Sequence, residues 1–186
     1  EEVEEMIAQI KRSIAEMDLV IERSVQVNQL DEAKLKPEVA DVDVVGEISD
    51  MAGQMISDWK DYELNAPASL RLRTDPQLFR MVFSNLIDNA IKYKADGSKV
   101  RISIQPDAVQ NGIEFAIENA PGPAGFPDPD LVYDKYYRSP MAHRQTGSGL
   151  GMYLVKGLLV PLKGRISYRP TADNVRFFVW MPNSLS

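Results

Sequence analysis

Residues 1–33 carry a hydrophobic stripe with the spacing of a coiled coil. No proline or glycine interrupts it before Pro37, and it weakens where Ser24 and Asn28 fall in line. The spacing predicts one long helix that needs a partner. A dimeric or helical-hairpin stalk is favoured over a helix that folds against its own domain. The apolar positions alternate at intervals of four and three: Val3, Ile7, Ile10, Ile14, Met17 and Ile21.

Residues 37–186 alternate between strand-like and helix-like patterns. A helix is predicted after Asp43, and a second begins at Thr74-Asp75-Pro76 and runs to about Tyr93. A third is predicted over 149–159. The order predicts an α+β fold, a two-layer α/β sandwich with one mixed sheet and three helices on one face. Strands are predicted at 39–42, 62–64, 69–73, 100–105, 113–118, 166–169 and 175–181, with a hairpin turn at Asn111-Gly112.

Residues 119–148 differ from their surroundings in being rich in Pro, Gly, Asp and Arg. A short amphipathic piece at 131–137 lies inside this stretch. A loop of this length within a compact domain is usually functional. We therefore expect it to form a lid over a binding site.

Composition narrows the function classes. The formal net charge of −6 argues against generic binding to nucleic acid through its phosphates. The absence of cysteine excludes disulfides and thiolate zinc sites. The apolar runs are too short to span a membrane. The chain begins with Glu-Glu-Val, so we expect a fragment of a longer protein. This part is expected in the cytoplasm, and a membrane anchor upstream is an open alternative.

Two asparagines one helical turn apart are the strongest chemical signal. Asn85 and Asn89 share one face of the predicted helix, and Lys92 lies three residues further along it. The apolar residues of the helix point elsewhere. Amide oxygen is a suitable ligand for Mg²⁺, and lysine balances phosphate charge. The pattern predicts a site for a metal-bound polyphosphate.

A glycine-rich turn, Thr146-Gly147-Ser148-Gly149-Leu150-Gly151, leads directly into the last helix. Glycine lets the backbone approach an anion closely, and amides at a helix start point toward it. The turn matches neither a Walker loop nor a Rossmann fingerprint. Taken alone, it is as consistent with a plain loop. Arg138 opens the loop that ends at these glycines, and contact with phosphate and simple solvation are equally open for it.

The order of these motifs resembles the ATP-binding catalytic domain of sensor histidine kinases, within the superfamily shared with gyrase, Hsp90 and MutL. The residues 85–93 are similar to the asparagine box, 132–138 to the phenylalanine box, and 146–151 to the second glycine box. The closing strand at 177–182 also resembles that of the family. The resemblance covers about residues 38–183.

The resemblance implies a Bergerat-type ATP-binding fold, with Mg²⁺ and ATP bound between the asparagine-box helix and a mobile lid. Asn89 is implied as the metal ligand with Asn85 beside it, and the catalytic contacts as Asn85, Lys92 and Arg138. Residues 1–36 are implied to be the second helix of a dimerisation and phosphotransfer hairpin, and 37–186 the catalytic domain. The implied nucleotide contacts are Asn85, Asn89, Lys92, Tyr93, Asn119, Thr146, Gly147, Ser148, Gly149, Leu150 and Gly151.

The first glycine box departs from the family pattern. Asn119 stands where the adenine-reading aspartate belongs, and Pro121 and Pro123 stand where two glycines belong. Asn119 keeps an acceptor for the adenine amine but carries no charge. Glu118 is one step along the strand and is expected to point to the opposite face.

Two functions follow from these motifs. The first is the catalytic part of a homodimeric histidine kinase that transfers the γ-phosphoryl of ATP to a histidine outside this chain and serves a response regulator or phosphotransfer protein. His143, the sole histidine, lies in the loop and is not expected to be the acceptor. The alternative is a degenerate domain with weak or no nucleotide binding that acts as a protein-interaction module.

Overall fold

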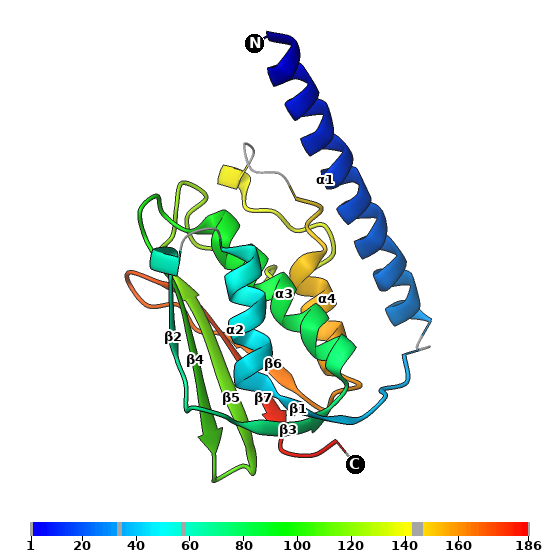
Figure 1. The fold of residues 1–186 in the computed structure, drawn as a ribbon, viewed down its shortest axis with the longest axis vertical. Helices are drawn as coiled ribbons and strands as arrows, with labels where there is room; N and C mark the ends of the chain where they lie inside the picture. The colour runs from blue at the N-terminus through cyan, green and yellow to red at the C-terminus, as the bar shows by residue number, and fades with distance from the viewer. Residues whose placement is uncertain (1, 33–34, 57–58, 143–146, 186) are drawn as a thin grey trace.

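The computed structural model describes residues 2–32, 35–56, 59–142 and 147–185, and it contains every helix and strand predicted from the sequence (Figure 1). The α-helices are α1 (Glu2–Asp31), α2 (Val44–Met55), α3 (Pro76–Tyr93) and α4 (Gly151–Leu159). The strands are β1 (Ala40–Asp43), β2 (Tyr62–Asn65), β3 (Arg71–Thr74), β4 (Val100–Asp107), β5 (Gly112–Asn119), β6 (Arg165–Tyr168) and β7 (Val175–Pro182). Two short 3₁₀ turns lie at Trp59–Asp61 and Pro140–Ala142.

The main sheet has five strands in the order β2-β4-β5-β7-β6. Strands β2 and β4 run parallel and the other neighbours are antiparallel, so the sheet is mixed. Helices α2, α3 and α4 cover one face of it, while β1 and β3 pair separately as a small ribbon (Figure 1). The predicted two-layer α/β sandwich is confirmed.

The core lies between the helices and the covered face of the sheet. Strand β7 buries every second residue, so that Val175, Phe177, Val179 and Met181 face the core. The rings of Phe79, Phe83 and Phe115 meet at centroid distances of 4.5–5.8 Å and join α3 to β5. Glu118 points to the other face, where it pairs with Arg101 and Arg176, as the strand alternation predicted.

The start of α3 is fixed by Asp75, and this sets the register of the asparagine pair. The Leu78 N–H donates to Asp75 Oδ1 at 2.9 Å, while the Glu38 N–H donates to Oδ2 at 2.6 Å. One buried carboxylate therefore caps the helix and holds the linker that arrives from α1. Pro76 follows in the first turn, as expected.

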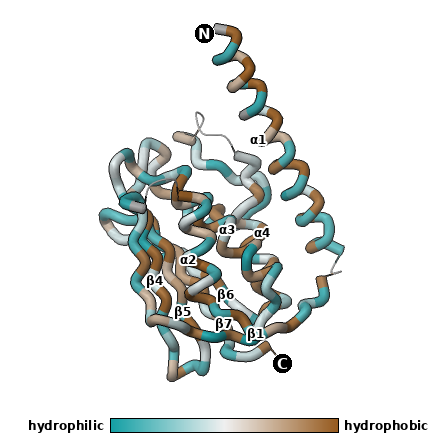
Figure 2. Tube along the Cα trace, in the orientation of Figure 1, coloured by the Kyte–Doolittle hydropathy of each residue, from teal (hydrophilic) through white to brown (hydrophobic). Residues whose placement is uncertain are grey.

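Helix α1 divides into two parts. Its first two-thirds project from the domain, and the predicted apolar stripe is exposed there, with Met17 64% accessible (Figure 2). Toward its end, α1 packs against α4, and Arg23 and Val27 are buried. The end of α1 thus folds against its own domain, while the dimeric or helical-hairpin stalk stays a prediction for the part whose apolar stripe is exposed. Among the described residues, no helix combines the length and hydropathy needed to cross a membrane.

Two sequence expectations differ in detail. Helix α4 begins at Gly151 rather than Gly149, because Gly149 adopts a left-handed φ of 69° that a helix does not allow. The piece at 131–137 folds as successive turns, with Tyr136 also at positive φ.

Candidate functional site

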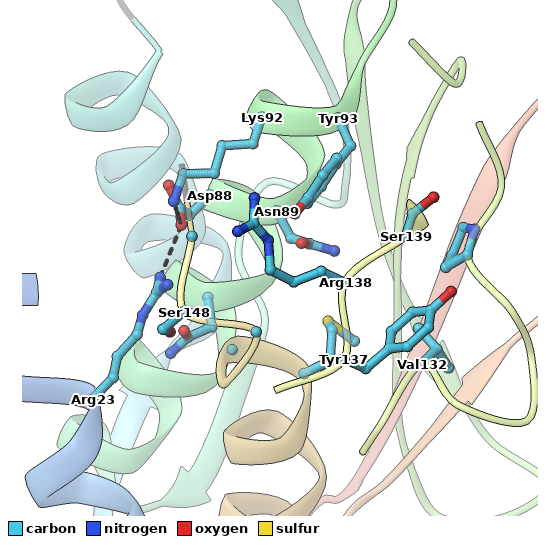
Figure 3. A pocket seen from close by; sticks show the side chains of 16 residues that line it. Arg23, Asp88, Asn89, Lys92, Tyr93, Val132, Tyr137, Arg138, Ser139 and Ser148 are labelled. Atoms are coloured by element: carbon cyan, nitrogen blue, oxygen red, sulfur yellow. Dashed lines mark hydrogen bonds and ion pairs between the residues drawn. The ribbon is translucent and has the colours of Figure 1, made fainter. Parts of the chain in front are cut away.

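A pocket opens between α3, the start of α4, the segment before it and α1 (Figure 3). Most of the predicted site residues line this pocket, although as many as 66 positions, from Asn85 to Gly151, separate them in the sequence. The pocket is lined by Arg23, Asn85, Asp88, Asn89, Lys92, Tyr93, Pro127, Val132, Tyr137, Arg138, Ser139, Gly147, Ser148, Gly149, Gly151 and Met152.

Asn85 has an unused acceptor at the pocket wall. Its Nδ2 donates to the Met81 carbonyl at 2.7 Å, which fixes the amide orientation. Its Oδ1 is buried, and no described residue donates a hydrogen bond to it. A Cβ at Gly151 would lie 3.3 Å from this oxygen, so glycine keeps the space beside it open. A buried carbonyl oxygen without a donor is costly, and a ligand or metal ion would relieve that cost.

Asp88 lies between two cations. The Arg23 guanidinium and the Lys92 ammonium both contact Asp88 Oδ2, each at 2.8 Å. Lys92 is one helical turn from Asp88, whereas Arg23 comes from α1. The three side chains together carry one net positive charge beside the asparagines.

The oxygen ligands at this wall are amides and one carboxylate. Among the residues that the structure describes, no group of three or more His, Cys, Asp or Glu side chains is arranged to hold a metal ion. Mg²⁺ commonly takes one or two protein oxygens and completes its shell with phosphate and water. Asn85, Asn89 and the adjacent cations fit a metal-bound polyphosphate.

The glycine-rich turn forms the floor of the pocket. A Cβ at Gly149 would lie 2.6 Å from the Tyr136 carbonyl carbon. The turn therefore packs directly on the backbone of residues 119–142, the described part of the stretch expected to form a lid, which is called the lid segment. The Leu150 N–H donates to Ser148 Oγ at 3.3 Å, and no side chain among the described residues caps α4. Leu150 itself is buried in the core, 2% exposed, and does not line the pocket. Thr146 and His143 lie outside the described residues.

The side of the pocket away from Arg23 is lined by two tyrosine rings and a valine (Figure 3). Tyr93, Val132 and Tyr137 face the pocket there. Burial raises the pKa of Tyr93, and the smaller effects of nearby groups partly cancel, because Arg138 lowers it and Asp88 raises it. Arg138 donates to the Ala142 carbonyl at 3.0 Å and points across toward Asn89 (Figure 3).

Asn119 does not line this pocket. It is 4% exposed, at the end of β5, and its Nδ2 donates to the Ala120 carbonyl at 3.1 Å. The following residues are fastened to the end of α3, because the Gly122 N–H donates to the Tyr93 carbonyl and the Ala95 N–H to the Ala120 carbonyl. Gly122 fits there because a Cβ would lie 2.7 Å from the Lys94 carbonyl oxygen.

Arg23 and Asp88 line the pocket although neither was predicted as a site residue. The residues of α1 that turn toward the domain are Arg23 and Val27, whereas Ser24 and Asn28, where the hydrophobic stripe weakens, stay exposed. No local signal in α1 therefore points to Arg23. Asp88 lies inside the asparagine box, one residue before Asn89.

Comparison with known proteins places this geometry in context. The family described as "Histidine kinase-, DNA gyrase B-, and HSP90-like ATPase" matches residues 74–185. The sensor histidine kinase CusS of Escherichia coli K12 is 26% identical over 187 residues, covering 97% of this chain and 38% of CusS. The sensor-like histidine kinase SenX3 of Mycobacterium tuberculosis is 30% identical over 155 residues, covering 80% and 37%. The chain thus spans well under half of these relatives.

Solved structures share the fold. The Acinetobacter baumannii histidine kinase AdeS matches with a TM-score of 0.77 at 21% identity, over 96% of this chain and 84% of that one. Full-length ShkA, solved in complex with AMPPNP, matches with a TM-score of 0.77 at 17% identity, over 100% and 40%.

Proposed function

The chain belongs to the histidine kinase-, DNA gyrase B- and HSP90-like ATPase family, and from this premise we propose that it is the catalytic part of a sensor histidine kinase. Residues 37–186 bind Mg-ATP, and residues 1–36 are the second helix of a dimerisation and phosphotransfer hairpin. The acceptor histidine lies outside this chain. The proposed partners are a second copy, joined through the exposed stripe of α1, and a response regulator or phosphotransfer protein in the cytoplasm.

One observation carries the proposal. Asn85, Asn89 and Lys92 meet the glycine-rich turn around a single pocket, where the buried Asn85 Oδ1 has no described hydrogen-bond donor. The sequence relation to sensor kinases and the shared fold support the same assignment.

The side chains have distinct tasks in this proposal. Asn89 offers an amide oxygen to Mg²⁺, with Asn85 beside it, and Lys92 and Arg138 balance phosphate charge. The amides of the glycine-rich turn and of the uncapped start of α4 face the phosphates. ATP, when bound, supplies the phosphoryl group that is transferred. Positioning and charge neutralisation account for most of the catalysis of such a transfer, so the domain needs no nucleophile of its own.

Calorimetric titration with ATP, with and without Mg²⁺, tests the proposal. We expect saturable, Mg²⁺-dependent binding that weakens at least tenfold in Asn89→Ala, because a metal-ligand oxygen is lost. Asn28→Ala removes the same side chain from an exposed position of α1 outside the pocket lining and is expected to bind like the wild type. Absence of saturable binding up to millimolar ATP would instead favour the degenerate interaction module, in keeping with Asn119, Pro121 and Pro123.

A further inference from the structure

Arg23 is a long-range addition to the pocket. It lies on α1, 65 residues before its partner Asp88, and is only 8% exposed. Arginine is seldom buried this deeply without a specific partner. The rest of the pocket is built by α3, the lid segment and the start of α4, so Arg23 is the contribution of α1 to its lining.

The end of α1 is held firmly enough to place this guanidinium. Val27 is 5% exposed, one turn after Arg23, and the last residue of the helix, Asp31, contacts Lys135 at 2.6 Å and Tyr153 at 2.8 Å. These contacts tie α1 to the lid segment and to α4. Arg23 is therefore presented by a docked helix rather than by a projecting one.

The charge around Arg23 favours an anion. Asp88 Oδ2 contacts both Arg23 and Lys92, each at 2.8 Å, and the three side chains together carry one net positive charge. Arg138 adds a further positive charge to the lining. The Arg23 guanidinium has several N–H donors and lies in a region of net positive charge, so it is well suited to bind phosphate oxygens.

The pocket also has a direction. Figure 3 shows Tyr137, Val132 and Ser139 at one end, Asn89 and Arg138 in the middle, and Arg23, Asp88 and Lys92 at the other. Apolar and aromatic groups suit a base or ribose, and clustered cations suit phosphates. A nucleotide that lies along this axis presents its last phosphate to the α1 end.

We propose that Arg23 contacts the terminal phosphate of a bound nucleoside triphosphate, so that α1 forms part of the nucleotide site. This inference rests on the proposed function. If Arg23 contacts the terminal phosphate, docking of α1 on the domain and binding of the triphosphate each strengthen the other by the same factor. The terminal phosphate then faces the helix that belongs to the proposed phosphotransfer hairpin.

Calorimetry with Mg-ATP and Mg-ADP tests the inference through the ratio of the two affinities. Arg23→Gln is expected to weaken Mg-ATP binding about tenfold or more and to change Mg-ADP binding by less than about twofold, because a charged hydrogen bond to the terminal phosphate is lost. Lys11→Gln, which removes a charge from the exposed part of α1, is the matched control and should change neither. Arg23→Lys should retain part of the preference for Mg-ATP.

Each other outcome has a definite meaning. Equal weakening of both nucleotides shows a structural role for Arg23, and equal strengthening shows that Arg23 blocks the pocket; either result overturns the inference and leaves the proposed function in place. A wild-type protein that binds neither nucleotide overturns both.

Hydrogen exchange on the wild type decides the question without any variant. We expect Mg-ATP to slow amide exchange around Arg23 on α1 more than Mg-ADP does. Equal protection by the two nucleotides overturns the inference, even if Arg23→Gln does not fold.

Discussion

Asp31, the last residue of α1, accepts a hydrogen bond at 2.8 Å from the hydroxyl of Tyr153 in α4, although 122 positions separate them. The other carboxylate oxygen contacts the Lys135 ammonium at 2.6 Å. One exposed side chain thus fastens the first helix to the helix that follows the glycine-rich turn and to the lid segment.

This contact predicts how Asp31 titrates. The Lys135 hydrogen bond first, and the Tyr153 hydrogen bond second, lower the pKa of Asp31 below its ordinary value. We expect Lys135→Met to raise the pKa of the Asp31 carboxyl, measured by carbon NMR, more than Tyr153→Phe does. Lys11→Met should leave it unchanged.

The same contact sets a pH range for the docking of α1. A lowered carboxyl pKa stabilises the docked state above the ordinary value near 4, and that stabilisation is lost as pH falls through the folded-state pKa. The pKa values of Lys135 and Tyr153 are raised, mainly by their hydrogen bonds to Asp31, so the contact weakens as pH rises beyond 10. Docking of α1 should therefore be insensitive to pH between about 4 and 10, as followed by the NMR signals of the α1 amides. A marked change of these signals near neutral pH would show that the Asp31 contacts with Lys135 and Tyr153 do not control the docking.

Asn119→Asp is expected to tighten ATP binding if residue 119 faces the base. A carboxylate accepts a charge-assisted hydrogen bond from the adenine amine, worth about 1–3 kcal/mol more than the bond it replaces, or roughly 5- to 150-fold in affinity. The free protein should unfold more easily, because aspartate cannot donate to the Ala120 carbonyl as the Asn119 amide does. Calorimetry and thermal unfolding measure the two effects.

Asn65→Asp makes the same change at an exposed position of β2 and should alter neither property. Unchanged or weaker ATP binding in Asn119→Asp would mean that residue 119 does not contact the base, in line with its position outside the present pocket lining.

Gly149→Ala is expected to damage the floor of the pocket. Gly149 has a φ of 69°, and an added Cβ would lie 2.6 Å from the Tyr136 carbonyl carbon. We expect a loss of about 1–3 kcal/mol in the free energy of unfolding, measured by chemical denaturation, together with weaker nucleotide binding. Gly147→Ala is the control within the same turn, because its Cβ would make only an ordinary contact at 4.0 Å with the Tyr93 hydroxyl. Similar losses in both variants would refute the steric explanation.

Local chemistry explains why most of the fold was predictable. The start of α3 follows from Asp75 and Pro76, the β4–β5 hairpin from Asn111-Gly112, and β7 from a short run of aromatic and β-branched residues. Each of these signals acts within a few residues, so no knowledge of the tertiary structure is needed. The grouping of Asn85, Asn89 and Lys92 is likewise a property of one helix.

The remaining features depend on contacts between distant segments. Arg23 reaches the pocket because α1 docks on α4, and the weakening of the apolar stripe does not identify the surface on which the helix docks. Asn119 could be placed at a strand end, but its hydrogen bond to Ala120 depends on how the following loop is fastened to α3. Gly149 delays the start of α4 because the turn must pass over the Tyr136 backbone.

Tyr133 and Tyr168 supply a test of the core beneath the lid. Both hydroxyls are buried without a hydrogen-bond partner among the described residues, and both rings pack on Phe177. Burial raises the pKa of each to about 12. Their ordinary value is near 10, so the folded state keeps the proton that the unfolded state releases, and stability should fall as pH rises from 10 to 12.

The double variant Tyr133→Phe/Tyr168→Phe keeps the ring packing and loses only unpaired hydroxyls. We expect it to match or slightly exceed the wild type in denaturant midpoint at pH 7 and to lose less stability at pH 11. Tyr136→Phe, at a position that is 71% exposed, should follow the wild type at both pH values. A double variant that is clearly destabilised at pH 7 would show that these hydroxyls have partners, and the burial of this region would then need another explanation.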